Sequence, residues 1–278
     1  MQLTLPRQRH LALNRPVVMG ILNVTPDSFS DGGKFQTLDH ALFTTEQMLL
    51  EGARIIDIGG ESTRPGAAAV SLEAELERVV PVIEAIRQRF DCVISIDTSK
   101  AAVMSAAVQA GADMINDVRA LQEPAALTVA ASLQVPVCLM HMQGAPRTMQ
   151  AAPVYQDVVQ EVYQFLLARA EQCQQAGIAA SQIILDPGFG FGKTLAHNYQ
   201  LLAALSKFVE SGYGVLAGMS RKSMIGQLLD VPVTERLAGS LACATLAAYA
   251  GAQIIRVHDV KETVQAVRIA AAARFGVE

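Results

Sequence analysis

The stretch from Gly20 to Gly33, GILNVTPDSFSDGG, decides the fold. A short apolar run ends abruptly at Asn23, and hydroxyl, carboxylate and glycine residues follow it. This order is typical of a buried strand that delivers polar side chains to one rim and then enters a loop. The same pattern recurs seven more times along the chain, which predicts a fold built by repeating one unit.

Eight short apolar runs, mostly continuous, predict strands that are covered on both faces. They are Val17–Asn23, Arg54–Gly59, Cys92–Asp97, Met114–Asn116, Val135–Met140, Ile183–Asp186, Val215–Met219 and Ile254–Val257. Segments with helical spacing lie between them. These are Asp39–Glu51 with Asp39 as N-cap, Ser71–Arg89, Lys100–Ala110, Pro124–Ser132, Tyr155–Ala176, Ala196–Ser211, Ser223–Leu229, Glu235–Ala250 and Lys261–Ala273.

Strands that alternate with helices form a parallel sheet, because each crossover returns across the sheet face. Eight such units in about 250 residues fit a closed (β/α)8 TIM barrel. A doubly wound open sheet is the alternative architecture. Leu3–Leu13 predicts a hairpin or lid ahead of the barrel, within an N-terminal segment of residues 1–16. No linker-like segment interrupts the series, so one domain over residues 1–278 is expected.

Composition disfavours several classes of protein. The chain of 278 residues is 51% hydrophobic and 17% charged, so it can bury a large core. A net charge of -4, with no run of like charge, disfavours a nucleic-acid or membrane-surface partner. The N-terminus lacks the apolar stretch of a signal peptide, and Leu237–Ala252 is too short to span a membrane. Four cysteines without CxxC spacing indicate reduced thiols in a cytoplasmic protein.

The active site of a (β/α)8 barrel lies at the C-terminal ends of its strands. The polar residues at these ends are Asn23, Glu61-Ser62-Thr63-Arg64, Asp97, Asn116-Asp117, His141, Asp186, Ser220-Arg221-Lys222 and Arg256-Val257-His258-Asp259. A lone aspartate after a strand is more often a cap or a surface residue. Eight polar ends in register favour one functional bowl.

One side of this bowl is cationic, with Arg64, Lys222, Arg256 and His258. Lys222 and Arg256 follow the seventh and eighth strands, which is a favoured phosphate position in barrels. Arginine presents a planar fork to phosphate oxygens and lysine a compact charge. A polyanionic substrate is therefore expected, and ion pairs at the rim are the structural alternative.

The other side of the bowl carries Asp97, Asn116 and Asp186. Two carboxylates and an amide suit a flat heterocycle rich in N–H groups, and such a site rejects analogues that lack the matching donors. Met140 and Phe191 are candidates to cover the ring faces, or they are ordinary core residues.

Three loops carry further candidates. Thr25–Gln36 and Glu61–Val70 are long and rich in Gly, Pro, Ser and Asp, as lids and binding loops are. Asn23, at the root of the first, could offer an oxygen to Mg²⁺ bridging substrate phosphates. The glycine-rich Asp186–Lys193, DPGFGFGK, lacks P-loop spacing, so its glycines are expected to bring backbone close to a bound ring.

Taken together, these motifs resemble the dihydropteroate synthase family of the folate pathway, from about Val17 to Val260. The motifs are NVTPDSFSDGG (23–33), DIGGESTRPG (57–66), SIDTSK (95–100), IND (115–117), LDPGFGFGK (185–193), GMSRKS (218–223) and RVHD (256–259). The resemblance implies a pterin-binding barrel that joins p-aminobenzoate to 6-hydroxymethyl-7,8-dihydropterin pyrophosphate, giving 7,8-dihydropteroate and pyrophosphate. It also implies Mg²⁺ as cofactor, a homodimer and inhibition by sulfonamides.

The family's functional residues carry over to matching positions of this sequence. The pterin would be held by Asp97, Asn116, Met140, Asp186, Phe191 and Lys222. The pyrophosphate would be bound by Asn23 through the metal and by Arg64, Arg256 and His258. The p-aminobenzoate pocket would be formed by Phe29, Thr63, Pro65, Phe189, Lys222 and Ser223. The catalytic set implied is Asp97, Asp186, Lys222, Arg256 and His258.

The chemistry of these residues agrees with a dissociative reaction. Cations and a metal stabilise departing pyrophosphate, and carboxylates stabilise the pterin cation that remains. The alternatives are a methyltetrahydrofolate methyltransferase-type barrel, which has no pyrophosphate to bind, a Schiff-base aldolase at Lys222, and a non-catalytic pterin or phosphate carrier.

Overall fold

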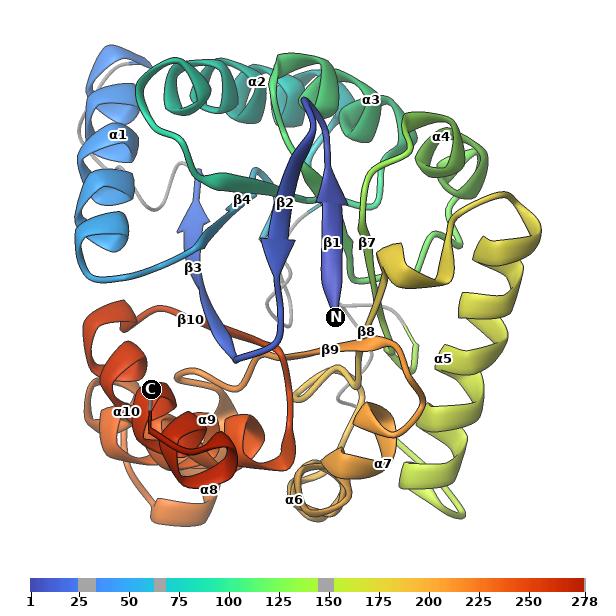
Figure 1. The fold of residues 1–278 in the computed structure, drawn as a ribbon, viewed down its shortest axis with the longest axis vertical. Coiled ribbons are helices and arrows are strands. Elements are labelled where there is room, and N and C mark those ends of the chain that lie inside the picture. Colours follow the sequence, from blue (N-terminus) through green and yellow to red (C-terminus); the bar gives the residue numbers. More distant parts are fainter. Residues whose placement is uncertain (25–33, 63–68, 145–152, 278) are drawn as a thin grey trace.

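The computed structural model describes residues 1–24, 34–62, 69–144 and 153–277. Within residues 34–62, side chains are described from residue 38 onward. Within these residues eight parallel strands close into a barrel, and helices form the outer ring (Figure 1). The strands are β3 (Val17–Asn23), β4 (Ile55–Gly59), β5 (Val93–Asp97), β6 (Met114–Asp117), β7 (Val137–Met140), β8 (Ile183–Asp186), β9 (Gly214–Ala217) and β10 (Ile254–Val257). Because β10 pairs with both β3 and β9, the barrel is confirmed and the open sheet is excluded.

Helices follow the strands in the expected alternation. They are α1 (Lys34–Leu50), α2 (Leu72–Arg89), α3 (Ala101–Ala110), α4 (Ala126–Leu133), α5 (Val158–Gln175), α6 (Leu195–Ala203), α7 (Leu205–Val209), α8 (Ser223–Leu229), α9 (Leu237–Ala250) and α10 (Val260–Phe275). Ser71 caps α2, since its hydroxyl accepts a hydrogen bond from the Ala74 N–H at 3.2 Å. Gly111 ends α3 with φ +126°, a conformation that favours glycine.

Three of the expected helices either begin three or more residues away from the expected position or are divided in two, and the other helix ends agree within two residues. α1 begins at Lys34, so Asp39 lies inside the helix and is not its N-cap. α5 begins only at Val158, because the Asp157 carboxylate caps it by accepting from the Gln160 N–H at 3.0 Å. The expected helix Ala196–Ser211 is two helices, since the backbone leaves helical geometry at Ala204.

The barrel interior is layered by polarity. Alternate residues of each strand point inward. The innermost N-terminal layer is apolar and consists of Met19, Ile55, Val93, Met114, Cys138, Ile184, Leu216 and Ile254. Two residues further along their strands stand Asp57, Ser95, Asn116, Asp186 and Arg256, so the interior becomes polar toward the C-terminal ends.

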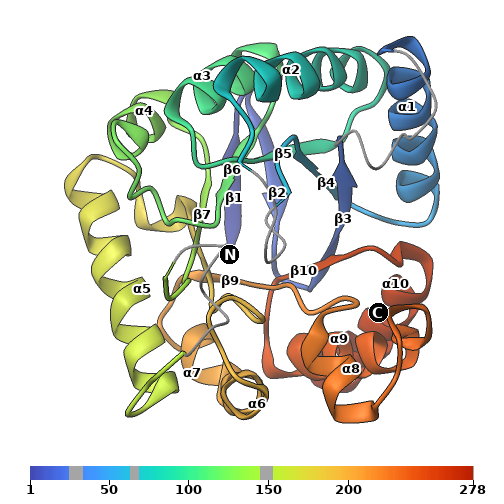
Figure 2. The ribbon, with the colours of Figure 1, turned by 180° about the vertical axis from the view of Figure 1, so that it is seen from behind.

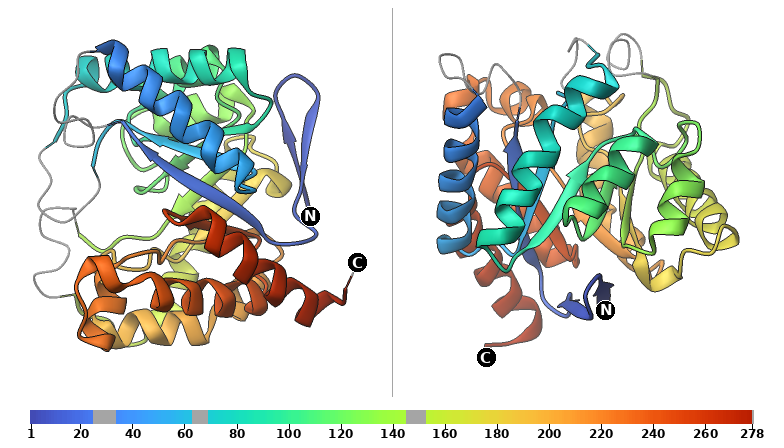
Figure 3. Two further views of the ribbon diagram at one scale, coloured as in Figure 1. Left: turned by 90° about the vertical axis from the view of Figure 1, so that its left-hand side faces the viewer. Right: turned by 90° about the horizontal axis from the view of Figure 1, so that it is seen from above.

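The N-terminal hairpin closes the opposite end of the barrel. β1 (Gln2–Leu5) and β2 (Arg9–Ala12) pair antiparallel. Their buried Leu3, Leu5 and Leu11 pack against the apolar interior layer. The hairpin lies in front of the strands in Figure 1 and behind them in the reverse view of Figure 2. Figure 3 shows it outside the barrel, at the end where α10 finishes. The hairpin is confirmed, and the lid alternative is wrong because this is the end away from the candidate site.

Asp113 fastens this hairpin to the barrel. Its buried carboxylate pairs with Arg7 at 2.5 Å and Arg9 at 2.9 Å, both from the hairpin, and with Arg87 of α2. Replacing Asp113 with alanine is expected to lower the free energy of unfolding by about 3–5 kcal/mol, because three cations lose their shared buried partner. Urea unfolding measures this. Asp91→Ala is the control, since Asp91 is 90% exposed and its ion pair within the described residues is with Arg9 at 3.3 Å. An equal loss in both variants would contradict the assignment.

Candidate active site

A hydrogen-bonded cluster at the C-terminal ends of the strands forms the floor of the candidate site. Arg256 Nε donates to Asp57 Oδ2 at 2.6 Å, and its Nη2 donates to Asp97 Oδ2 at 2.8 Å. Asn116 Nδ2 also donates to Asp57 Oδ2, at 3.1 Å. Neither β10 and β5 nor β4 and β6 are neighbouring strands, so these bonds cross the barrel interior. The structure thus places Asp97 and Asn116 side by side and brings Arg256, which was expected on the cationic side, against this floor.

Asp57 is a member of this floor that the sequence analysis did not assign. It is fully buried, and one carboxylate oxygen receives both Arg256 and Asn116. Among the described residues its Oδ1 has no hydrogen-bond partner, and neither has the Ser95 hydroxyl beside it in register. The available signal was the carboxylate inside the otherwise apolar IIDIG strand. A buried carboxylate needs a partner, and here Arg256 supplies it.

Burial shifts the protonation equilibria of the floor. It raises the pKa of Asp97 to about 7, although Arg256 opposes the shift. It also raises the pKa of Asp186, opposed by Lys222 and by the Gly188 N–H, which donates to Asp186 Oδ1 at 2.7 Å. For Lys222, burial lowers the pKa to about 8, with Asp186 acting in the other direction. The pKa values of Asp97 and Lys222 therefore both lie closer to neutral pH than those of a free aspartate and a free lysine.

The loop after β8 supports Lys222. Lys222 Nζ donates to the Phe189 carbonyl oxygen at 2.5 Å and lies 4.6 Å from the centroid of the Phe191 ring. Phe189 contributes this carbonyl, while its side chain is fully buried. Gly188 has φ +72°, and a Cβ there would lie 1.9 Å from the His141 carbonyl oxygen. Only glycine permits this approach of two backbones.

The remaining expected residues take different positions. Met140 ends β7 and is buried, whereas Ser223 is exposed at the start of α8. The His258 N–H donates to the Ser220 hydroxyl at 3.2 Å, and His258 Nδ1 lies 3.1 Å from the same oxygen. His141 turns away from the bowl toward a buried lysine. The expected site residues Phe29, Thr63, Arg64 and Pro65 lie outside the described residues.

Ion pairs at the rim involve other cations. Arg221 pairs with Asp259, and its Nε donates to Asp259 Oδ2 at 2.9 Å. Arg221 is not one of the four residues expected on the cationic side. Of those four, Arg256 pairs with Asp57 and Asp97 instead of with Asp259 or Glu61, and it joins the cationic side of the bowl to its floor.

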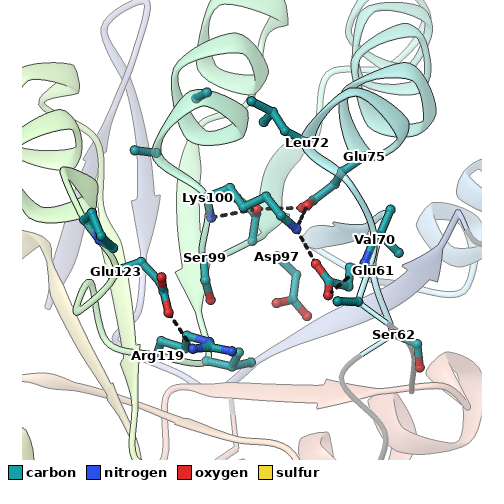
Figure 4. A pocket seen from close by; sticks show the side chains of 16 residues that line it. Glu61, Ser62, Val70, Leu72, Glu75, Asp97, Ser99, Lys100, Arg119 and Glu123 are labelled. Atoms are coloured by element: carbon teal, nitrogen blue, oxygen red, sulfur yellow. Dashed lines mark hydrogen bonds and ion pairs between the residues drawn. The ribbon is translucent and has the colours of Figure 1, made fainter. Parts of the chain in front are cut away.

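A cavity of about 650 Å³ opens beside Asp97 (Figure 4). Lys100 bridges Glu61 and Glu75 on one wall, and Arg119 pairs with Glu123 on another. Figure 4 shows Asp97 facing the space between these pairs. A volume of this size is typical of small-molecule sites. Of the floor residues, Asp97 lines this cavity, whereas Asp57, Asn116, Asp186 and Arg256 are not part of its lining.

Comparison with known proteins identifies the family. Residues 19–258 match the family described as pterin binding enzyme. The chain belongs to the pterin-binding enzymes. The dihydropteroate synthase of Escherichia coli strain K12 is 60% identical over 259 residues, which cover 93% of this chain and 92% of that protein. The dihydropteroate synthase of Haemophilus influenzae is 61% identical over 253 residues, covering 91% and 92%.

Solved structures of relatives have the same fold as this pterin-binding enzyme. The Yersinia pestis dihydropteroate synthase in a sulfonamide drug complex has a TM-score of 0.93 and 60% identity, covering 99% of each chain. The Xanthomonas albilineans dihydropteroate synthase in complex with 7,8-dihydropteroate has a TM-score of 0.90 and 48% identity, again covering 99% of each chain. The chain is thus a transferase of the dihydropteroate synthase type, as expected from its motifs, and not a methyltransferase-type barrel.

Oxygen donors at the strand ends of this pterin-binding enzyme bear on the expected binding of Mg²⁺. Among the described residues, no group of three or more His, Cys, Asp or Glu could hold a metal ion. Asn23 Oδ1 and Asp97 Oδ2 lie on the same side of Gly59, since a Cβ on Gly59 would lie 3.9 Å from each, and Asp97 Oδ2 also accepts from Arg256. Two oxygens suit Mg²⁺, which keeps waters and takes substrate phosphate oxygens as further ligands. The residues therefore fit a cation shared with the substrate.

One expectation concerns membranes. In the described part of the chain, no helix has the length and apolar character needed to cross a bilayer. This agrees with the interpretation of Leu237–Ala252 as too short a span.

Proposed function

We propose that this enzyme condenses 6-hydroxymethyl-7,8-dihydropterin pyrophosphate with p-aminobenzoate by dissociative loss of pyrophosphate. The observation that carries the proposal is the bridging position of Arg256. Its guanidinium binds Asp97 on the floor of the bowl and projects from β10, beside Lys222, on the cationic side. The pterin ring, on the floor, and its pyrophosphate substituent, on the cationic side, would both lie next to Arg256.

The floor suits the pterin. Asp97 and Asp186 offer carboxylate oxygens to ring N–H groups, and Asn116 offers an amide whose orientation Asp57 fixes. Met140 and Phe191 would pack against the ring, and the Lys222 ammonium would face its polar edge. Because the pKa of Asp97 lies at about 7, this carboxyl group can donate or accept a hydrogen bond near neutral pH.

The cationic side suits pyrophosphate. Arg256 uses two of its five N–H donors on the floor, and His258 is oriented by Ser220. Arg64 would complete this side. Mg²⁺, when bound through Asn23, would supply further positive charge to the pyrophosphate oxygens. The p-aminobenzoate would lie nearer the rim, between Lys222, Ser223 and Phe189 and the loop residues Phe29, Thr63 and Pro65.

The chemistry follows from these charges. The C–O bond to pyrophosphate breaks first, and the electron pair leaves with the departing oxygen into the cationic side. The resulting pterin cation is stabilised by the carboxylates of Asp97 and Asp186. The amine of p-aminobenzoate is neutral at pH 7, so it attacks the cation without a strong general base and then loses a proton. Excluding water keeps the cation from being hydrated.

Pyrophosphate release tests this proposal. With both substrates, release is expected to match formation of dihydropteroate. Without p-aminobenzoate, a slower release is expected, together with a pterin cation or its water adduct detected by mass spectrometry. Release that depends strictly on the amine would exclude the dissociative step. Absence of release with both substrates would instead indicate a carrier without catalysis.

Three expectations stay predictions at this point. They are binding of Mg²⁺, a homodimer and a cytoplasmic location. The exposed Leu246, Tyr249 and Ile269 of α9 and α10 are compatible with the expected dimer face on these helices.

A further inference from the structure

Lys193 is a buried lysine that the proposed reaction does not use. It is 3% exposed, and its Nζ lies within hydrogen-bond distance of three acceptors. These are His141 Nδ1 at 3.0 Å, the His141 carbonyl oxygen at 3.2 Å and the Phe191 carbonyl oxygen at 2.9 Å. An ammonium has three N–H donors, so this set accounts for all of them. Lys193 thus joins the end of β7 to the loop after β8.

The loop that Lys193 holds is the one that presents groups to the floor. Its Phe189 carbonyl accepts from Lys222, its Gly188 N–H donates to Asp186, and its Phe191 ring lies against the Lys222 ammonium. Among the described residues, further hydrogen bonds to this loop come from Tyr155 and Asn198. The Tyr155 hydroxyl donates to the Gly192 carbonyl at 2.8 Å, and Asn198 Oδ1 accepts from the Gly190 N–H at 2.7 Å.

We propose that Lys193 is a positioning residue for the pterin floor. Its ammonium fixes the 187–193 loop against His141, and the loop in turn fixes Asp186 and Lys222. This inference rests on the proposed function, because it concerns the same pterin site. Lys193 itself would not touch the substrate.

Charges around Lys193 give it a second influence on the site. The titratable groups that face it are His141 at the end of β7, Asp186 on β8 and Lys222 before α8, with Tyr155 bound to the same loop. Burial lowers the pKa of His141 to about 3, and Lys193 adds to this shift, so the imidazole is neutral and its Nδ1 accepts. In its charged form Lys193 also lowers the pKa of Asp186, against the effect of burial. Burial lowers the pKa of Lys193 itself well below its ordinary value, and the nearby Asp186 opposes this shift.

Lys193→Met keeps the length of the stem and removes the donors and the charge. We expect this variant to bind 6-hydroxymethyl-7,8-dihydropterin pyrophosphate about 10- to 100-fold more weakly, because small displacements of site groups cost effects of this size. Calorimetry without p-aminobenzoate measures the affinity. The pH at which binding is lost on acidification is expected to move upward, because Asp186 loses a cation that favours its ionised form. If the role of Lys193 were purely structural, its replacement would not move this acid limb of the pH dependence of binding.

Two further variants make the test decisive. Lys261→Met removes an exposed lysine of α10 and is expected to bind as the wild type does. Tyr155→Phe removes the hydroxyl bond to Gly192 and is expected to weaken binding without moving the acid limb; it decides the question if Lys193→Met does not fold. Wild-type affinity in both loop variants would overturn the positioning role. Failure of the wild-type enzyme to bind the pterin substrate would instead overturn the proposed function.

Discussion

Replacing Arg256 with methionine is expected to cause the largest combined loss of activity and stability in this enzyme. The guanidinium is the shared partner of two buried carboxylates, Asp57 and Asp97. Its removal leaves both without a cation, which should lower the free energy of unfolding by about 3–5 kcal/mol. The rate constant kcat/KM should fall by about 10²–10³-fold, as when a preorganised donor to developing negative charge is lost. Urea unfolding and pyrophosphate release measure the two effects.

Arg221→Met is the matched control for this substitution. Arg221 also pairs with a carboxylate of the same region, Asp259, but its side chain is 47% exposed. Solvent screens such a pair, so both stability and kcat/KM should change little. The double variant Asp57→Asn with Arg256→Met should recover part of the stability but not the activity. Equal stability of Arg256→Met and Arg221→Met would contradict the role given to the Arg256 guanidinium.

Lys222→Ala is expected to lower kcat/KM by about 10²–10³-fold with little loss of stability. The ammonium lies between the Phe189 carbonyl and the Phe191 ring and faces Asp186. Removing it deprives the pterin edge and the departing pyrophosphate of a buried cation. Steady-state kinetics with both substrates measure the loss. Unchanged activity would refute the assignment of Lys222 to the site.

The pH dependence provides an independent check on Lys222. Because burial lowers its pKa to about 8, the wild-type activity should decline as the pH rises through about 8. Lys222→Arg, which stays protonated, should retain its own activity to higher pH. The decline in activity is not explained by a loss of folding stability on deprotonation of Lys222. The unfolded chain binds this proton up to about 10.5, so the lysine's contribution to stability rises with pH between these values.

Most of the fold could be predicted because the strands are buried on both faces. Val17–Asn23, Ile183–Asp186 and Ile254–Val257 were predicted with their observed bounds, since Pro16, Gln182 and Gln253 directly precede these mainly apolar runs. Helix boundaries were harder, because they depend on which nearby residue caps the first turn. Asp39 is a good N-cap by residue type, yet α1 begins before it, whereas Asp157 does cap α5.

The candidate site could be predicted only where its residues lie at or near the end of a strand. Asp97 ends β5, and Asn116 and Arg256 lie one residue before the ends of β6 and β10, so their position near one rim was predictable, whereas the contact of Arg256 with Asp97 was not. Asp57 lies in the middle of a strand, and its part in the floor follows from the register of β4 against its neighbours. His141 follows the last residue of β7 but turns toward Lys193, which depends on how the 187–193 loop folds back. Position along a strand is visible in sequence, whereas the direction of a side chain beyond its end is not.

The hairpin at the N-terminal end of the barrel has a consequence for the order of events in the proposed reaction. Because leucines of β1 and β2 pack against the apolar end of the barrel, the floor opens toward the opposite side in the described part of the chain. In the proposed reaction, a pterin on Asp97, Asn116 and Asp186 would lie deeper than p-aminobenzoate beside the exposed Ser223. We therefore expect the pterin to enter first and the joined product to leave before a second pterin arrives.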